Sequence, residues 1–416
     1  MSYPKARLGN YIDVLSGFAF KSKDFSETGV PVIKIKNISP PCVTLEDLSY
    51  VPQNIAFQNQ RYILHKGDVL IAMTGSHINQ IASVVGRVGR VRYDDVTVLN
   101  QRVSKIINKD DKTSDLDYIY YYLSQYDVKV ELAQKAGGAA NQANISPSDI
   151  KELLFPCPSI ETQHRIATIL SRYDALIENY QKQIKLLEEA AQRLYKEWFV
   201  DLRFPGYENT KVVDGVPEGW EKKKLGEITS KFATGLNPRK NFVLGNGNNY
   251  YVTIKNMANN DVIFDDKCDK VDDEALEKIN KRSNLQSGDL LFSGIGTIGR
   301  VYLIDKPVKN WNISESVFTM RPKEGIPSTF LYLVLLDKEI QDYCQSNAHG
   351  CAQKGIRMAD LKAFEILIPP KIILNAFNSF ASNFIKQAKC KSYQIRLLTE
   401  ARDRLLPKMM GGEINV

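Results

Sequence analysis

The sequence contains two copies of one pattern, and this repeat constrains the fold of the 416-residue chain more than any other feature. The matching segments are "LGNYIDVLSGFAF" from Leu8 with "LGEITSKFATGL" from Leu225, "VIKIKNI" (32–38) with "YVTIKNM" (251–257), "KGDVLIA" (66–72) with "SGDLLFS" (287–293), and "QANISPSDIKELLFPCP" (142–158) with "QKGIRMADLKAFEILIPP" (353–370). Because each copy of an internal repeat builds one structural unit, we expect two similar domains.

Each copy follows the same order of predicted elements. Short β-like runs separated by Gly, Asn and Asp turns surround one helical stretch, "DYIYYYLSQYDVKVELAQ" (117–134) or "STFLYLVLLDKEIQDYCQ" (328–345). We expect the tyrosines of "DYIYYY" to pack in the core rather than stack on bases. The prolines of "FPCPSIETQ" and "LIPPKIILN" end a strand and precede a long helix. The sequence therefore predicts an α+β fold, with a mixed α/β domain and then a long helix in each copy.

A glycine pattern in the second copy suggests a dinucleotide-binding enzyme. Gly294, Gly296 and Gly299 spell G-x-G-x-x-G after a strand-like run. The first copy lacks this pattern, and in the second "RVYLIDKP" follows, a β-branched run that Pro307 ends. A phosphate-binding fingerprint must instead open a helix, whose N-terminal amides hold the pyrophosphate. We therefore interpret the glycines as turn residues between two strands.

The two long helices are predicted from apolar residues spaced alternately by three and four. No Gly or Pro interrupts residues 161–204, which as one helix would be about 55–60 Å long. In the second helix Gln387, Lys391 and Gln394 fall on the strict register, whereas Ala388 fits if the phase slips. The predicted helix–helix seam comprises Ile166, Leu170, Ile177, Ile184, Leu187, Leu194, Phe377, Phe380, Phe384, Ile395 and Leu398.

These helices suit an antiparallel intramolecular coiled coil. Because the copies follow head to tail, such pairing gives pseudo-two-fold symmetry, sets the two domains at opposite ends and brings the chain termini close together. The alternative is that each helix is an ordinary core helix packed on its own domain.

Composition excludes several classes of protein. The six cysteines are scattered without a C-x-x-C pair, which indicates reduced thiols in a cytoplasm and disfavours zinc. No apolar run approaches the roughly 18 residues that span a membrane, and "MSYPKARLGN" has no secretory signal. The chain lacks a G-x-x-x-x-G-K-[ST] loop for ATP. The net charge of +7 is compatible with a polyanionic partner without requiring one.

Three further segments carry a resemblance to a known family. "LFPCPSIETQHRIATIL" (154–170), "RLYKEWFVDLRFPGYE" (193–208) and "RDRLLPKMMGGEI" (402–414), with "GDVL" and "GDLL" in the two copies, resemble the specificity (S) subunit of type I restriction-modification systems. The resemblance covers essentially the whole chain. It implies target-recognition domain 1 at 1–158, a central conserved helical region at 159–206, target-recognition domain 2 at 207–370 and a C-terminal conserved helical region at 371–416.

The resemblance also implies a function. Each target-recognition domain reads one half of a bipartite double-stranded DNA sequence, and the helices act as a ruler for the spacer. The chain is then a non-catalytic subunit with no cofactor or metal of its own. Two modification (M) subunits carry S-adenosylmethionine and methylate adenine, and restriction (R) subunits carry ATP-driven translocation and nuclease activity with Mg²⁺.

Candidate DNA contacts lie in repeated polar segments. In "VIKIKN" a strand would place Lys34 and Lys36 on one face, and the following amides of Asn37 and Asn256 suit bidentate pairing with adenine. The other candidates are Arg87, Arg90, Arg92, Lys255 and Arg300, with Asn141, Gln142, Gln353, Lys354 and Arg357 in glycine-bearing loops. Features shared by both copies should serve the framework or phosphates, whereas residues that read bases should differ.

Two other classes of function stay open from the residues alone. One is a coiled-coil scaffold that joins proteins and never touches DNA. The other is an enzyme of the dinucleotide-binding or nuclease type.

Overall fold

The computed structural model describes residues 3–58, 60–75, 84–136, 143–258, 261–350 and 353–416. Its contacts divide the chain into two compact units. Unit 1 comprises Met1–Asn179 with Gln394–Val416, and unit 2 comprises Tyr180–Tyr393. Helices α5 (Ile160–Tyr195) and α10 (Lys371–Gly411) each contribute to both units.

Unit 1 contains two mixed sheets. The first has the strand order β2-β12-β8-β10-β5-β4 and the second β6-β3-β11-β7. Their strands are β2 (Ile12–Ser16), β3 (Val30–Ile33), β4 (Ile38–Ser39), β5 (Cys42–Val43), β6 (Ser49–Val51), β7 (Ile63–Leu64), β8 (Val69–Ala72), β10 (Val88–Arg90), β11 (Thr97–Leu99) and β12 (Val103–Asn108). Two smaller pairs are β1 (Lys5–Arg7) with β14 (Leu154–Pro156) and β9 (Thr74–Gly75) with β13 (Ala143–Asn144).

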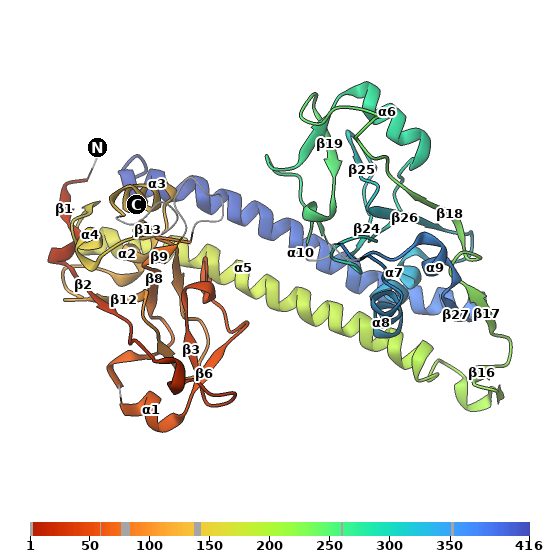
Figure 1. The fold of residues 1–416 in the computed structure, drawn as a ribbon, viewed down its shortest axis with the longest axis horizontal. Helices are drawn as coiled ribbons and strands as arrows, with labels where there is room; N and C mark the ends of the chain where they lie inside the picture. The colour runs from red at the N-terminus through yellow and green to blue at the C-terminus, as the bar shows by residue number, and fades with distance from the viewer. Residues whose placement is uncertain (1–2, 59, 76–83, 137–142, 259–260, 351–352) are drawn as a thin grey trace. The chain divides into compact units, whose positions relative to one another are not determined.

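The shorter helices of unit 1 lie at two places. Figure 1 shows α1 (Gln53–Gln58) grouped with β3 and β6, apart from α2 (Leu116–Leu123), α3 (Tyr126–Lys135) and α4 (Pro147–Lys151). As predicted, the tyrosines of α2 pack in the core, where Tyr118, Tyr120, Tyr121 and Tyr122 are all buried. Their hydroxyls still find acceptors, as buried phenols require: Tyr118 donates to the Pro156 carbonyl at 2.9 Å.

Unit 2 repeats this arrangement. One sheet has the order β18-β26-β23-β24 and another β22-β19-β25, with further pairs β17–β27, β20–β21 and β15–β16. The strands are β15 (Val212–Val213), β16 (Val216–Pro217), β17 (Glu221–Lys224), β18 (Thr229–Thr234), β19 (Asn249–Val252), β20 (Met257–Ala258), β21 (Asp261–Val262), β22 (Asp269–Val271), β23 (Leu290–Ser293), β24 (Val301–Leu303), β25 (Trp311–Ile313), β26 (Val317–Pro322) and β27 (Glu365–Ile368).

The helices of unit 2 divide in the same way. In Figure 1, α6 (Asp273–Arg282) lies with β19 and β25, apart from α7 (Ser328–Leu336), α8 (Lys338–Ser346) and α9 (Met358–Ala363). The strand registers of the two units also correspond. In unit 1, β8 pairs with β10 through Val69↔Arg90, and in unit 2, β23 pairs with β24 through Leu290↔Leu303. The repeat seen in the sequence is therefore a structural repeat.

The glycine pattern lies in a turn, as predicted. It begins after β23, and the strand that follows, β24, pairs antiparallel with β23. Gly296 and Gly299 have φ values of +80° and +95°, a left-handed conformation that glycine adopts without a Cβ penalty. Because the glycines join two strands and open no helix, the dinucleotide interpretation is excluded.

The long helices pack together in each unit, and they run antiparallel. In unit 1, Ile166 and Leu170 at the start of α5 share a core with Met409 and Met410 at the end of α10. In unit 2, residues from the end of α5 share a core with the start of α10; the ring centroids of Tyr195 and Phe377 lie 6.5 Å apart. Tyr3 and Val416 pack against the unit 1 core, so both ends of the chain belong to that unit.

The predicted seam positions differ in burial, and Phe380 is the most exposed of them. Ile166, Leu170, Ile177 and Phe377 are buried. Ile184, Leu187, Leu194, Phe384, Ile395 and Leu398 are partly buried. Phe380 is 56% exposed, because beyond Phe377 the buried positions shift by one residue to Ala381, Ile385 and Ala388. The phase slip expected at Ala388 therefore already begins at Ala381, about two turns earlier, consistent with a local stutter.

The first helix also ends sooner than the sequence suggests. The α-helix stops at Tyr195, a π-helical turn covers Lys196–Val200, and Leu202 has a φ of +57°. Trp198 and Phe199 are buried from this turn in the unit 2 core. The π-helical turn thus places these two aromatic side chains in the core. The α-helix therefore ends where they pack, without a glycine or proline at that point.

Candidate nucleic-acid interface

The repeated Lys-Asn segments form tight turns rather than strand. β3 ends at Ile33 and β19 at Val252, and 3-10 turns cover Ile35–Asn37 and Ile254–Asn256. The prediction that Lys34 and Lys36 share one face of a strand is therefore wrong.

The asparagines of these turns are framework residues. Asn37 is 1% exposed and Asn256 7%. The Asn37 side chain accepts the Lys34 N–H at 3.0 Å and donates to the Glu46 carbonyl at 2.8 Å. Asn256 accepts the Thr253 N–H at 2.9 Å in the same way. Since both side chains are buried and their oxygens are held by the turns, the structure contradicts the predicted presentation of Asn37 and Asn256 to adenine.

The lysines of the same turns face outward. Lys36 and Lys255 are exposed at equivalent positions. Lys34 is half-buried, with its ammonium 4.1 Å from the centroid of the Phe25 ring and donating to Ser49 Oγ at 2.9 Å. Burial, and then the charge of Lys36, lower the pKa of Lys34. Contact of these lysines with DNA stays a prediction.

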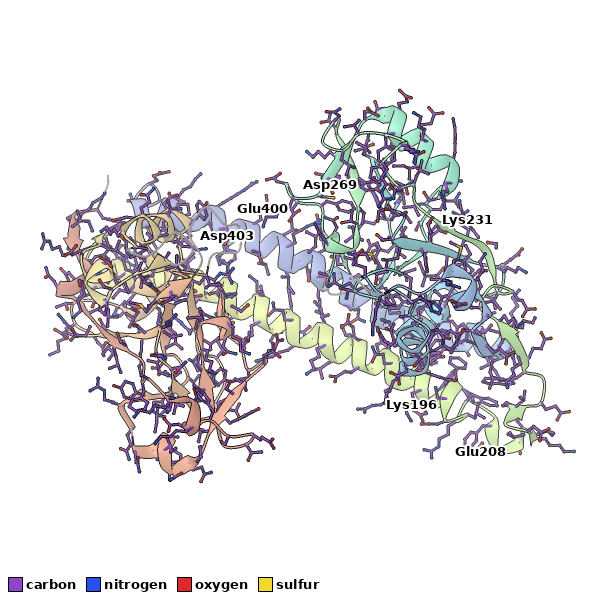
Figure 2. All side chains as sticks on the ribbon, viewed as in Figure 1. Lys196, Glu208, Lys231, Asp269, Glu400 and Asp403 are labelled. Atoms are coloured by element: carbon purple, nitrogen blue, oxygen red, sulfur yellow. The ribbon has the colours of Figure 1, made fainter. Side chains whose placement is uncertain are left out.

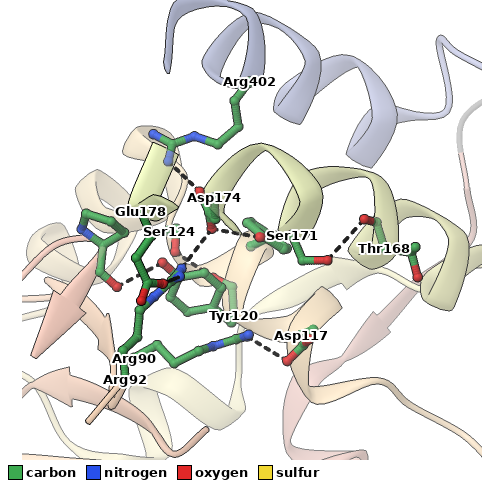
Figure 3. A network of polar contacts seen from close by, with 12 residues as sticks. Arg90, Arg92, Asp117, Tyr120, Ser124, Thr168, Ser171, Asp174, Glu178 and Arg402 are labelled. Atoms are coloured by element: carbon green, nitrogen blue, oxygen red, sulfur yellow. Dashed lines mark hydrogen bonds and ion pairs between the residues drawn. The ribbon is translucent and has the colours of Figure 1, made fainter. Parts of the chain in front are cut away.

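Arg90 and Arg92 point inward instead of toward solvent. Figure 3 shows both in a network of polar contacts within unit 1. Arg90 lies 4.4 Å over the Tyr120 ring, and its Nη2 is 2.7 Å from Asp117 Oδ1. Arg92 Nη1 donates to Glu178 Oε2 at 2.7 Å, and its Nη2 lies 3.3 Å from Asp174 Oδ2. These contacts contradict a role for either guanidinium as a free DNA contact.

Asp174 is the centre of this network. It is 4% exposed and also accepts from Arg402 Nη1 and from the Tyr121 hydroxyl, both at 2.7 Å. Burial alone lowers the pKa of Arg92, but the hydrogen bond to Glu178 and the charge of Asp174 outweigh it and raise that pKa. Arg402 also pairs with Asp403, labelled in Figure 2, at 2.8 Å. The network joins the sheet, α2, α5 and α10 of unit 1, so it is structural.

A pocket of about 430 Å³ opens beside the network in unit 1. Its lining includes Pro41, Tyr121, Tyr126, Asp174 and Arg402. Because Asp174 and Arg402 already neutralise each other there, we assign the pocket no chemistry. Among the described residues, no group of three His, Cys, Asp or Glu side chains is placed to hold a metal ion.

In unit 2 three segments carrying predicted residues are joined by hydrogen bonds. Arg300 Nη1 donates to the carbonyls of Ile254 and Met257, at 2.9 Å for Ile254. The Gly296 N–H donates to the Lys354 carbonyl at 2.7 Å, and Ile356 to Gly294 at 2.8 Å. Arg300 is thus used inside the fold, which contradicts its predicted role as a free DNA contact.

The three hydrogen-bonded segments of unit 2 leave several side chains exposed. Lys255, Gln353, Lys354 and Arg357 face solvent around the glycine turn of unit 2. In unit 1 the equivalent turn is joined in the same way, since Ile145 donates to the Met73 carbonyl at 2.9 Å and β9 pairs with β13. Asn141 and Gln142 lie outside the described residues. Arg87 is half-buried and lies near Lys129, whose pKa is lowered by burial and then by the charge of Arg87.

The repeated Gly-Asp dipeptides are also framework. Asp68 accepts the His65 N–H, and Asp289 the Gln286 N–H, each at 2.8 Å. Each carboxylate pairs with a cation of a neighbouring strand, Lys105 or Arg321, at 2.7 and 2.6 Å. "GDVL" and "GDLL" thus fix a turn, which explains why both copies share them.

Sequence reasoning missed one pair of exposed basic positions in each unit. Lys21 and Lys23 follow β2, and Arg239 and Lys240 follow β18; all are exposed. The repeat itself held the signal, because each pair comes a few residues after the glycine of "LSGFAF" or "FATGLN".

Comparisons with known proteins agree with this duplicated architecture. The family model "Type I restriction modification DNA specificity domain" matches residues 3–189 and again 217–390. The type I restriction enzyme MjaIX specificity subunit of Methanocaldococcus jannaschii is 29% identical over 95% of this chain and 93% of its own length. The type I restriction enzyme EcoBI specificity subunit of Escherichia coli is 23% identical over 99% and 86%.

A solved structure shares the fold. The S subunit of a type I restriction-modification system from M. genitalium superimposes with a TM-score of 0.60 at 17% identity, over 99% of this chain and 96% of that one. None of the described helices combines the length and apolar character that crossing a membrane requires. With two family matches that together cover most of its residues, the chain belongs to the type I restriction modification DNA specificity domain family.

Proposed function

We propose that this chain is the DNA specificity subunit of a type I restriction-modification complex, in which unit 1 and unit 2 each read one half of a split DNA target. The observation that carries the proposal is the duplication: the family model matches twice, and each match contains the two main sheets and the exposed lysine turn of one unit. Two similar but unequal recognition surfaces on one chain suit two unequal half-sites.

The chemistry of the complex would reside in other chains. M subunits would supply S-adenosylmethionine and adenine methylation, and R subunits would supply ATP hydrolysis, Mg²⁺ and cleavage. The polar networks of this chain have structural explanations, since the Asp174 carboxylate and the Asp68 and Asp289 carboxylates neutralise cations within the fold. The role proposed for the chain is therefore binding and positioning, with catalysis supplied by its partners.

DNA contact would fall to exposed cations and amides. Lys36, Lys255, Gln353, Lys354 and Arg357 are exposed and remain candidates. Arg90, Arg92 and Arg300 leave this set because their guanidiniums are held within the fold.

The test is modified-base sequencing of DNA from cells that carry the cognate M subunit, with and without this chain. We expect a split motif with methylated adenines in both halves only when the chain is present. Identical methylation in both cells, with M–S assembly verified by mass, would overturn the proposal and favour a scaffold. Replacing unit 1 by that of a relative should change one half of the motif and leave the other.

A further inference from the structure

The loops after β2 and β18 have the same design in both units although their sequences differ. We call residues 17–25 loop A and residues 235–242 loop B. Each begins with a glycine that touches the backbone of a neighbouring strand end: a Cβ on Gly17 would lie 2.1 Å from the Asn100 carbonyl oxygen, and one on Gly235 1.7 Å from that of Ile313. Since no other residue fits there, the path of each loop is fixed at its start.

Each loop is also anchored by aromatic packing. Phe20 and Phe25 of loop A pack with the small core around Val32 and Val98 in unit 1. In loop B, the Phe242 ring centroid lies 5.5 Å from that of Tyr251, and Phe242 packs with the core around Val271. These apolar anchors face inward and hold the loops against the sheet that lies farther from α2 or α7.

Polar contacts complete the anchoring. In loop A, Asp24 accepts the Lys21 N–H at 2.8 Å, so this carboxylate is turned toward its own backbone. In loop B, the Asn237 amide donates to Glu315 at 2.7 Å, and Tyr251 donates to the same carboxylate at 3.0 Å. Polar contacts therefore fix both loops: the one acid of loop A is turned toward backbone, and loop B is held by Glu315, which follows β25.

What the loops leave exposed is basic. Lys21 and Lys23 of loop A, and Arg239 and Lys240 of loop B, point away from these anchors into solvent. None of these four cations forms an ion pair with an acid in the part of the chain that the structure describes. Basic groups shared by both copies suit the part of a ligand that is the same in both halves of a target, namely the phosphate backbone.

Loop A is continuous with the lysine turn of unit 1. The Lys34 ammonium lies over the Phe25 ring, at 4.1 Å from the centroid, and Lys36 follows on the exposed side of the turn. Burial is the main cause of the lowered pKa of Lys34, and repulsion by the charge of Lys36 is the second. A polyanion bound across the turn would relieve that repulsion.

We propose that loop A with Lys36, and loop B with Lys255, are the phosphate-binding surfaces on which the two halves of the DNA target rest. This inference rests on the proposed function and assigns these cations to positioning rather than to base reading. Because phosphate contacts release counterions, each contact contributes about 0.9 to the slope of log affinity against log salt concentration.

The experiment measures DNA affinity of the M–S complex from about 50 to 200 mM salt, on target and on unrelated duplex. Lys21→Gln with Lys23→Gln, and separately Arg239→Gln with Lys240→Gln, should each lower the salt slope by about 2 and weaken binding about tenfold on both duplexes. Lys21→Arg with Lys23→Arg should bind like the natural chain. The matched control is Lys278→Gln with Lys281→Gln on α6, which removes two exposed lysines that are paired to Glu274 and Glu277.

Phosphate ethylation interference separates the two surfaces. The loop A variant should lose interference in one half-site only, and the loop B variant in the other. If both variants keep the slope and affinity of the natural complex, the loops lie outside the footprint and this inference falls while the proposed function stands. If they instead weaken assembly with the M subunit, measured by mass at fixed salt, the loops bind protein and the inference is overturned. If the natural M–S complex binds no DNA, the proposed function itself fails.

Discussion

In each unit an ion pair joins the end of a strand to a long helix, and the two ion pairs have opposite polarity. Arg92 and Asp305 are each the second residue after the corresponding strands β10 and β24, and Glu178 and Lys389 lie equally far from the starts of α5 and α10. In unit 1 the strand side is the cation, at 2.7 Å; in unit 2 it is the anion, at 3.3 Å.

The surroundings of the two pairs differ as well. Beside the unit 1 pair the buried position on α5 is Asp174, with Arg402 and Tyr121 bound to it, whereas the equivalent position on α10 is the apolar Ile385. Lys389 donates to the Leu303 carbonyl, and its pKa is lowered because burial outweighs the charge of Asp305. The strand and the helix are thus joined by a charged network in unit 1, and by one ion pair beside an apolar side chain in unit 2.

The opposite polarity of the two ion pairs would disfavour packing of one unit's strand on the other unit's helix. If the unit 1 strand packed on the unit 2 helix, Arg92 would face Lys389, and in the reverse case Asp305 would face Glu178. Like charges at such positions would disfavour the wrong pairing.

The largest effect is expected on removing the centre of the unit 1 network. Asp174→Ala leaves the guanidiniums of Arg92 and Arg402 without their buried carboxylate, and breaking such a pair costs about 3–5 kcal/mol. The equivalent conservative change in unit 2, Ile385→Val, should cost about 1 kcal/mol. Urea unfolding with hydrogen exchange resolved by peptide measures both, and loss of protection should concentrate in α2 and the first half of α5.

A companion variant tests whether charge is needed there at all. Arg92→Leu, Asp174→Ile and Arg402→Leu together replace the centre of the network by apolar side chains, and such replacements are often neutral or stabilising. Stability well above that of Asp174→Ala is therefore expected. A triple variant as unstable as Asp174→Ala would show that the network does more than neutralise its own charges.

The next effect comes from giving each unit the other's residue. Arg92→Asp sets a carboxylate beside Asp174 and Glu178, and we expect a loss of about 2–3 kcal/mol. Asp305→Arg faces Lys389 at a more exposed place, since the Asp305 side chain is 36% exposed, and should cost about 1 kcal/mol. Lys389→Glu added to Asp305→Arg should recover part of that loss in a double-mutant cycle. Asp266→Arg, an exposed change of the same charge, is the control, and equal losses for it and Asp305→Arg would refute the pairing.

How much of this the sequence could predict depends on the range of each interaction. The repeat, the long helices and the glycine turn follow from periodicity and from comparing the copies, because a 3–4 spacing or a strand–turn–strand pattern is local. The Asp174 network joins residues far apart along the chain, such as Asp174 and Arg402, and no spacing rule connects them.

The candidate DNA contacts were harder to predict for a related reason. A Lys-Asn pair is equally suited to reading a base and to closing a turn, and only burial showed that Asn37 closes one. Arg90 and Arg92 resembled a basic surface patch because the sequence does not show that α2 and α5 cover them. Comparing the two copies does reveal the exposed basic pairs, Lys21 with Lys23 and Arg239 with Lys240. Each pair begins four residues after the corresponding glycine, although the surrounding sequences differ.

Alkaline pH should destabilise the fold through the buried tyrosines of α2. Burial raises the pKa of Tyr120 to about 12, from 10.0, and raises those of Tyr118, Tyr121 and Tyr122 as well. Their folded forms keep protons that the unfolded chain releases, so the stability they contribute is present below pH 10 and is lost as pH rises from about 10 to 12. On α7 only Tyr332 occupies an equivalent position. The melting temperature should therefore fall less steeply with pH in Tyr118→Phe, which carries the residue of the corresponding α7 position, Phe330; an unchanged slope would contradict this.

The smallest effect is expected at Phe380, where the seam prediction fails. Phe377 is fully buried and its ring centroid lies 4.6 Å from that of Phe199, so Phe377→Ala should cost about 3–5 kcal/mol. Phe380 is 56% exposed, with only an edge contact to Trp198 at 6.5 Å, and Phe380→Ala should cost less than about 1 kcal/mol. Urea midpoints of the two variants compare them directly. If Phe380→Ala proved as damaging as Phe377→Ala, the strict heptad register would describe α10 better than the shifted one, and the start of the second helix would then carry the same uninterrupted seam as the first.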